Sequence, residues 1–94
     1  MKRKTYRLDE LKAGTTIFVG GVDHAHPDLQ PFLAEFLVVG GGARWPEPGE
    51  MTPYRVSKEM AETMSKHLPL HRTRASAARY AMAERRACQA RWRQ

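Results

Sequence analysis

The large apolar residues of this 94-residue chain are very unevenly distributed. Of its sixteen Leu, Ile, Val and Phe residues, thirteen lie between Leu8 and Val39, three more lie between residues 56 and 70, and none follows Leu70. The N-terminal part must therefore supply most of the core. The last quarter of the chain has mainly alanine to pack against it.

Length and composition narrow the class of protein. A chain of this size forms one domain, residues 1–94, and buries only about 60–65% of the surface that its unfolded chain exposes. Large enzyme scaffolds do not fit. No apolar run reaches the roughly 18–20 residues of a membrane span, and the basic start is not followed by the apolar segment of a signal peptide. With one Cys and no internal disulfide, we expect an intracellular, cytoplasmic protein.

The clearest strand signal is a β-branched and aromatic run at residues 15–19, which begins after Gly14 and ends at a pair of glycines. Residues 11–19 follow the pattern Leu-x-x-Gly-Thr-x-Ile-x-Val, which resembles the entry of some small SH3-like barrels. The resemblance implies a small β-rich fold with this strand near its start.

The next apolar segment, residues 29–39, fits two structures. As a helix it would place five apolar residues in a stripe at i, i+3, i+4, i+7 and i+8. As a strand it would place Phe32, Ala34, Phe36 and Val38 on one face. We favour the strand, because the segment is short, ends in Val-Val-Gly and follows another strand with which it can pair. The helix stays an open alternative.

Residues 40–53 contain four Gly and three Pro and predict a long, mobile loop. Within it, Trp45 follows Arg44 and either caps the edge of the core or projects as a contact residue. Trp and Arg are the usual anchors of protein interfaces, so both are candidate partner-binding residues. Residues 53–56 could add a short strand.

Two helices are expected in the remaining chain. Ser57 is a plausible N-cap for a helix from residue 58 to about 67, and Thr73 for a helix over residues 74–93. The second is rich in Ala and Arg and contains no Gly or Pro. The sequence therefore predicts an α+β fold: a small antiparallel sheet within residues 5–57, then a short helix and a long C-terminal helix within residues 58–94.

The formal charge of +6 is concentrated in the C-terminal quarter. Residues 71–94 carry seven Arg and one acid, Glu84, whereas the first seventy residues sum to zero. The seven-residue spacing keeps four of these arginines within about 60° of one another on a helix. The four form an arginine stripe: Arg72, Arg79, Arg86 and Arg93. Arg72 belongs to it only if the helix extends back past Thr73.

The arginine stripe is either a solvated helix face or a binding surface. Charged helix faces are often merely solvated. A solubilising face normally mixes both signs, however, and Glu84 has no basic residue three or four positions away to pair with. This favours an anionic partner, either a nucleic-acid backbone or an acidic protein surface. Arg85, beside the stripe, and Trp92, near the chain end, complete the candidate binding set.

Motifs for chemistry are weak. Residues 24–28 spell His-x-His-x-Asp, which resembles part of the metal-binding motif of the metallo-β-lactamase family, but Leu29 stands where that motif continues with His. That family's scaffold is also far longer than this chain. Cys88 has no identifiable base or oxyanion loop near it and fits a small core residue. We therefore expect no metal, no cofactor and no enzyme activity.

The leading hypothesis is a non-enzymatic protein that binds nucleic acid through the phosphate backbone. If four stripe arginines each neutralise one phosphate of duplex DNA, log K falls against log salt with a slope of about −3.6. The alternative is an adaptor or inhibitor that contacts a host complex, similar in size and make-up to the accessory proteins of bacteriophages and mobile elements. Because an Ala-rich helix ending near Trp92 could also pair with its copy, a homodimer stays open.

Overall fold

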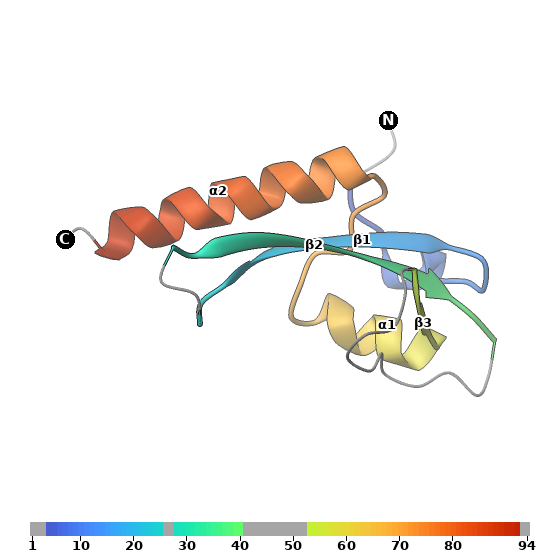
Figure 1. Ribbon diagram of the computed structural model, residues 1–94. Helices are drawn as coiled ribbons and strands as arrows, with labels where there is room; N and C mark the ends of the chain where they lie inside the picture. The colour runs from blue at the N-terminus through green and yellow to red at the C-terminus, as the bar shows by residue number, and fades with distance from the viewer. Residues whose placement is uncertain (1–3, 26–27, 41–52, 93–94) are drawn as a thin grey trace.

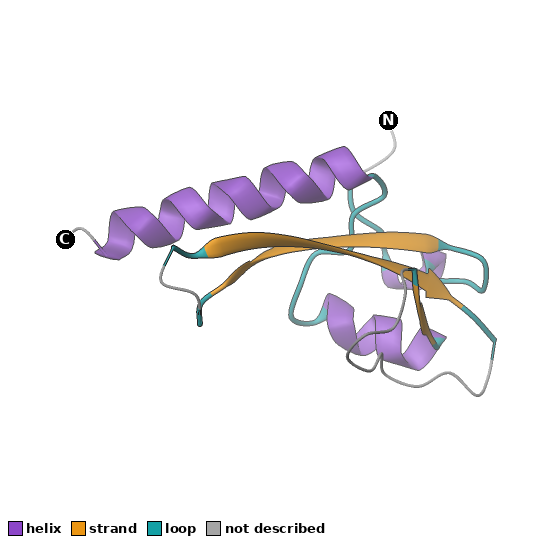
Figure 2. Ribbon diagram, viewed as in Figure 1, coloured by secondary structure: helices purple, strands orange, loops and turns teal. Residues whose placement is uncertain are grey.

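The computed structural model describes residues 4–25, 28–40 and 53–92, with the side chain of Trp92 left out. Over these residues the chain forms a three-stranded sheet with a helix on each face (Figures 1 and 2). A short helical turn, η1 (Leu8–Glu10), precedes the sheet. The α+β class, with a short helix followed by a long one, is confirmed. The SH3-like resemblance stays a prediction, and most of the expected loop at 40–53 lies outside the described residues.

The sheet is mixed. β1 (Thr16–Asp23) and β2 (Gln30–Val38) form an antiparallel hairpin, whereas β3 (Tyr54–Val56) runs parallel to β2. The prediction of a wholly antiparallel sheet is therefore wrong at β3. A parallel neighbour needs a connection of about a dozen residues or more, and the segment between Val38 and Tyr54 is long enough to provide it.

Both long strands refine the sequence predictions. β2 confirms that residues 29–39 favour a strand over a helix, since it covers almost the same segment. β1 does not end at Gly20 as expected but continues through both glycines to Asp23. Glycine is kept inside this strand because a helix backbone lies against it: a Cβ on Gly20 would lie 2.1 Å from the carbonyl oxygen of Ala77.

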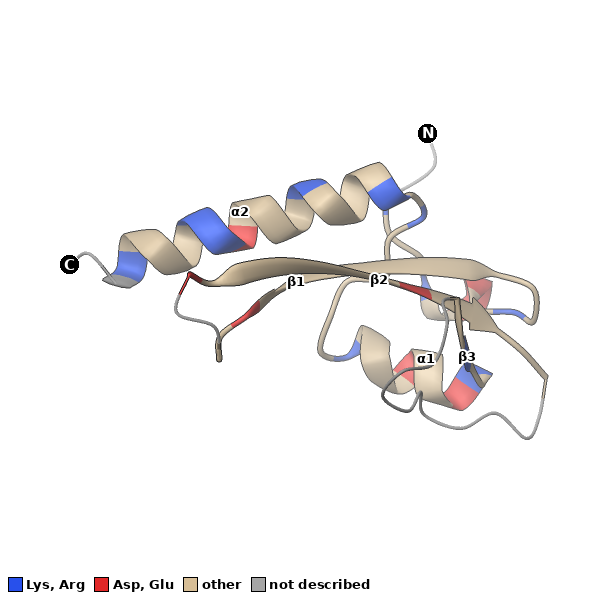
Figure 3. Cartoon of the chain, viewed as in Figure 1, with Lys and Arg blue, Asp and Glu red and all other residues tan. Residues whose placement is uncertain are grey.

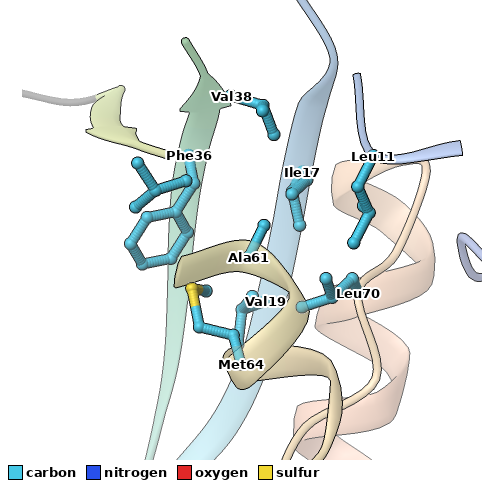
Figure 4. Packing of buried hydrophobic residues seen from close by; sticks show 9 residues of the cluster. Leu11, Ile17, Val19, Phe36, Val38, Ala61, Met64 and Leu70 are labelled. Carbon is cyan, nitrogen blue, oxygen red and sulfur yellow. The ribbon is translucent and has the colours of Figure 1, made fainter. Parts of the chain in front are cut away.

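The main core lies between the sheet and α1 (Lys58–Ser65), as Figure 4 shows. Ile17 and Val19 point from β1 toward Ala61 and Met64 of the helix, and β2 contributes Phe36. Side chains from the flanking segments close the cluster, which also includes Leu11, Val38, Val56 and Leu70. The apolar residues of the N-terminal part thus form the core, as their distribution predicts.

The helix N-caps are where the sequence predicts them. The Ser57 hydroxyl accepts a hydrogen bond of 3.1 Å from the backbone N–H of Met60. The Thr73 hydroxyl accepts one of 3.1 Å from the N–H of Ser76 at the start of α2 (Arg74–Trp92). Each cap satisfies a backbone donor that the first helical turn leaves unpaired.

α2 covers the face of the sheet opposite α1 (Figure 1). Its inner side is lined by Ala77, Ala81 and Cys88, each at most 3% exposed. Small side chains allow the helix axis to lie close to β1, and Gly20 removes the remaining obstacle. The predicted small-residue face is therefore the face that packs on the sheet, and the other side of α2 is exposed.

The segment before α2 pairs with the outer edge of β1. His71 and Phe18 exchange backbone hydrogen bonds of 2.8 and 3.0 Å. On the other side of this segment, the N–H of Arg72 donates to the carbonyl of Lys4 at 2.9 Å. The backbone of Lys4 therefore lies beside the beginning of α2.

Candidate nucleic-acid interface

The exposed side of α2 carries the two arginines on which the candidate interface depends. Arg79 and Arg86 are both exposed, and neither forms an ion pair or side-chain hydrogen bond with another described residue. Figure 3 shows basic residues along the whole length of this helix. We call the exposed positions of α2 between residues 75 and 91 the outer α2 face: Ala75, Ala78, Arg79, Met82, Ala83, Arg86, Ala87, Ala90 and Arg91.

This face has a single sign of charge. Its nine side chains include three arginines and no acid. Glu84, the one acidic residue of the helix, is only half exposed and interacts electrostatically with Tyr80. The unpaired cations therefore meet no internal counter-charge on their own helix, which is the arrangement that an anionic partner would neutralise.

Arg72 does not belong to the stripe in space. It precedes the first residue of α2, and its guanidinium forms an ion pair with Glu10 and lies 4.6 Å from the ring centroid of Tyr6. The helical extension past Thr73 that the heptad required is absent, because Thr73 is the cap of α2. The Arg72 guanidinium holds the pKa of the Glu10 carboxyl below its ordinary value, so this pair serves to fasten the N-terminal segment.

Two arginines of α2, Arg74 and Arg85, are engaged within the protein. Arg74 donates to the Glu35 carboxylate at 2.7 Å and lies over the ring of Phe18. Arg85 donates to the backbone carbonyl of Asp28 at 3.3 Å, which ties the helix to the hairpin connection. Because this bond holds Arg85 toward the sheet, its predicted role in partner binding gains no support.

Arg91 is exposed but also has an internal contact, since its guanidinium lies 3.1 Å from the sulfur of Cys88. The remaining predicted residues fall outside the described part of the chain. These are Arg44, Trp45 and Arg93, together with the side chain of Trp92, whose backbone ends α2. Of the predicted site, the structure thus brings Arg79 and Arg86 together on one exposed surface.

One additional basic residue lies near the N-terminal end of this surface. Lys4 is exposed, and its backbone carbonyl accepts a hydrogen bond from Arg72 just before α2 begins. Arg7 is also exposed, at the turn where its backbone N–H donates to the Glu10 side chain. Lys4 therefore adds a positive charge beside the start of α2.

His71 is a buried polar residue that the sequence did not single out. It is 6% exposed, its Nδ1 lies 2.7 Å from the hydroxyl of Ser76, and its ring lies 5.5 Å from that of Tyr80. Its Nε2 has no hydrogen-bond partner in the structure. Burial lowers the pKa of the imidazole, so the neutral form is favoured where the pre-helix segment, β1 and α2 meet.

Within the described ranges, no three His, Cys, Asp or Glu side chains are grouped so that they could hold a metal ion. Neither described helix combines the length and the apolar character needed to cross a bilayer.

Comparison of the chain with protein-family models, curated proteins and solved structures finds no significant match.

Proposed function

We propose that this chain is a non-enzymatic binding protein whose outer α2 face engages nucleic acid, mainly through the phosphate backbone. Arg79 and Arg86 supply the central contacts, because arginine binds phosphate with two parallel hydrogen bonds. Lys4 adds a positive charge near the start of the helix. Phosphate contacts position a protein without reading a sequence, so the proposal includes no base preference.

One observation carries the proposal: two exposed arginines share a helix face that has no acid, while other arginines nearby are already paired. Arg72 pairs with Glu10 and Arg74 pairs with Glu35, so these two arginines stabilise the fold. Arg79 and Arg86 have no such structural task among the described residues. Their positive charge is therefore available to a partner.

Binding of a fluorescently labelled mixed-sequence nucleic acid tests the proposal by anisotropy. At about 50 mM salt the wild type should bind, and the double variant Arg79→Ala/Arg86→Ala should lose most of its affinity. The matched control is Lys58→Ala/Lys66→Ala, which removes the same net charge from α1 and its C-cap on the opposite face of the sheet. If both variants lose the same affinity, the loss depends only on net charge, which would contradict a defined interface on α2.

A second candidate function is the adaptor or inhibitor of a host protein. It is favoured by large apolar side chains that stay exposed, among them Leu33 of β2 and Met82 of α2, at 37% and 40%. Exposed apolar groups next to arginines are typical of protein interfaces.

A pull-down with and without nuclease separates the two functions. The adaptor function predicts one stoichiometric partner that survives nuclease and is lost in Leu33→Ser/Met82→Ser. The nucleic-acid function predicts that nuclease removes whatever the wild type retains. A nuclease-resistant partner bound by a chain that fails the anisotropy test would favour the adaptor function.

A further inference from the structure

The outer α2 face is a convex rod, so any groove at this interface must belong to the partner. Five of its nine side chains are alanines, which leave the helix close to its bare backbone diameter. An α-helix with side chains is about 10–12 Å across, and the major groove of B-form DNA is about 12 Å wide. The shapes match without rearrangement of either partner.

The chemistry of the same face argues against single strands. Proteins that hold single-stranded nucleic acid combine basic residues with aromatic side chains on which the bases stack. Between residues 75 and 91, no exposed position of α2 carries an aromatic residue. Tyr80 is half-buried and its ring faces His71. Among these described positions, a flexible strand would therefore gain phosphate contacts but no stacking.

Double-stranded RNA also fits this face poorly. Its major groove is too deep and narrow for a helix, and its shallow minor groove is recognised through the 2′-hydroxyls. On the outer α2 face only the arginines could hydrogen-bond these hydroxyls, since the other exposed side chains are Ala and Met. The chain's one amide in this stretch, Gln89, is half-buried.

We infer that the partner of the outer α2 face is B-form duplex DNA, with α2 lying along the major groove. This rests on the proposed function. Arg79 and Arg86 are separated by about 10.5 Å along the helix axis, so their guanidinium groups can reach two separate phosphates at the edge of the groove. Ala83 lies between them in the sequence and allows the helix to approach closely.

The mounting of α2 preserves this spacing. The helix is fixed to the sheet at its first turn by the ion pair of Arg74 with Glu35. Near its middle it packs on Gly20 through Ala77 and Ala81. Further along, Arg85 donates to the backbone of Asp28. Since the backbone of the helix holds the arginines at a set distance, less conformational entropy is lost when they bind two phosphates.

The test compares three labelled probes of one mixed sequence: duplex DNA, duplex RNA and single-stranded DNA. Wild-type protein should bind duplex DNA about tenfold more tightly than either other probe, a difference of about 1.4 kcal/mol. Ala83→Met should weaken binding of duplex DNA several-fold by lifting the helix. The control Thr63→Met places the same side chain on an exposed position of α1 and should leave affinity unchanged.

The outcomes separate this inference from the function on which it rests. Equal or tighter binding of RNA or single strands, still lost in Arg79→Ala/Arg86→Ala, overturns duplex DNA as the partner and leaves nucleic-acid binding intact. Unchanged affinity in a folded Ala83→Met variant overturns the docking of α2 in the groove. No binding of any probe at about 50 mM salt overturns both.

Discussion

Gly20 of β1 and Ala77 of α2 approach so closely that strand and helix meet backbone to backbone. A Cβ built on Gly20 would lie 2.1 Å from the carbonyl oxygen of Ala77 and 3.3 Å from the Cβ of Ala81. Real Cβ atoms do not come this close to backbone oxygens, so only glycine fits at this position. This contact sets the distance between the sheet and the helix that carries Arg79 and Arg86.

Gly20→Ala should therefore push α2 away from the sheet. We expect a loss of about 1–3 kcal/mol in the free energy of unfolding, the usual effect of overpacking a close contact. Urea denaturation measures it. The control is Gly40→Ala, where an added Cβ has no atom within 4 Å and which should change stability little. If both variants are equally stable, the close packing of α2 on β1 is wrong.

Thr73→Ala should weaken the start of α2. The Thr73 hydroxyl accepts the hydrogen bond of the Ser76 N–H, and loss of an N-cap costs about 1 kcal/mol. Thr63 lies within α1, is exposed and bonds only to the carbonyl of Glu59. Thr63→Ala should therefore be neutral or slightly stabilising. Thermal denaturation of the two variants checks the difference, and equal midpoints would argue against the cap.

The stability of the fold should fall as the pH drops below about 6.5 because of His71. Burial lowers the pKa of this imidazole below its ordinary value of 6.5, so the unfolded chain takes up a proton before the folded one does. The stabilisation is complete above pH 6.5 and decreases as the pH falls toward the pKa in the folded state. The neighbouring groups do not stabilise a protonated His71, since Arg72 and Arg74 are cations and Tyr80, whose pKa is raised, stays neutral.

Denaturation between pH 7.5 and about 5 measures this effect, before most carboxyl groups titrate. The Glu10 carboxyl, whose pKa is lowered by Arg72, contributes only at more acidic pH, where its protonation removes the ion pair. His71→Phe should flatten the dependence over this range whatever its own stability, whereas His67→Gln, at an exposed position, should retain it. A wild-type stability that does not change between pH 7.5 and 5 would contradict the buried neutral imidazole.

Local features of this fold could be predicted from the sequence. Ser57 and Thr73 have the side chains that cap helices, and both do so. The apolar pattern of the β2 segment fits a helix as well as a strand. The strand before it and the Val-Val-Gly at its end favour a strand, which is the structure it forms. These predictions succeed because each depends on residues within a few positions of one another.

Features that depend on distant residues were missed. The parallel pairing of β3 depends on the path of residues 39–53, which no local pattern reveals. From the sequence, Gly20 predicts the end of a strand. Its actual role, to let the backbone of Ala77 approach, depends on a residue far along the chain. The seven-residue spacing of the arginines likewise gives no sign of Glu10, which lies far from Arg72 in the sequence. The ion pair with Glu10 holds Arg72 away from the stripe. The charge pattern therefore overestimated the number of unpaired arginines in the stripe.

The salt dependence of duplex DNA binding tests the central claim most directly. Each phosphate contact contributes about −0.9 to the slope of log K against log salt, so Arg79→Ala/Arg86→Ala should make the slope shallower by about 1.8. Lys58→Ala/Lys66→Ala should leave the slope within about 0.5 of the wild type, since α1 faces away from the proposed interface. A slope that is the same in the wild type and in Arg79→Ala/Arg86→Ala would contradict the claim that the outer α2 face binds the phosphate backbone.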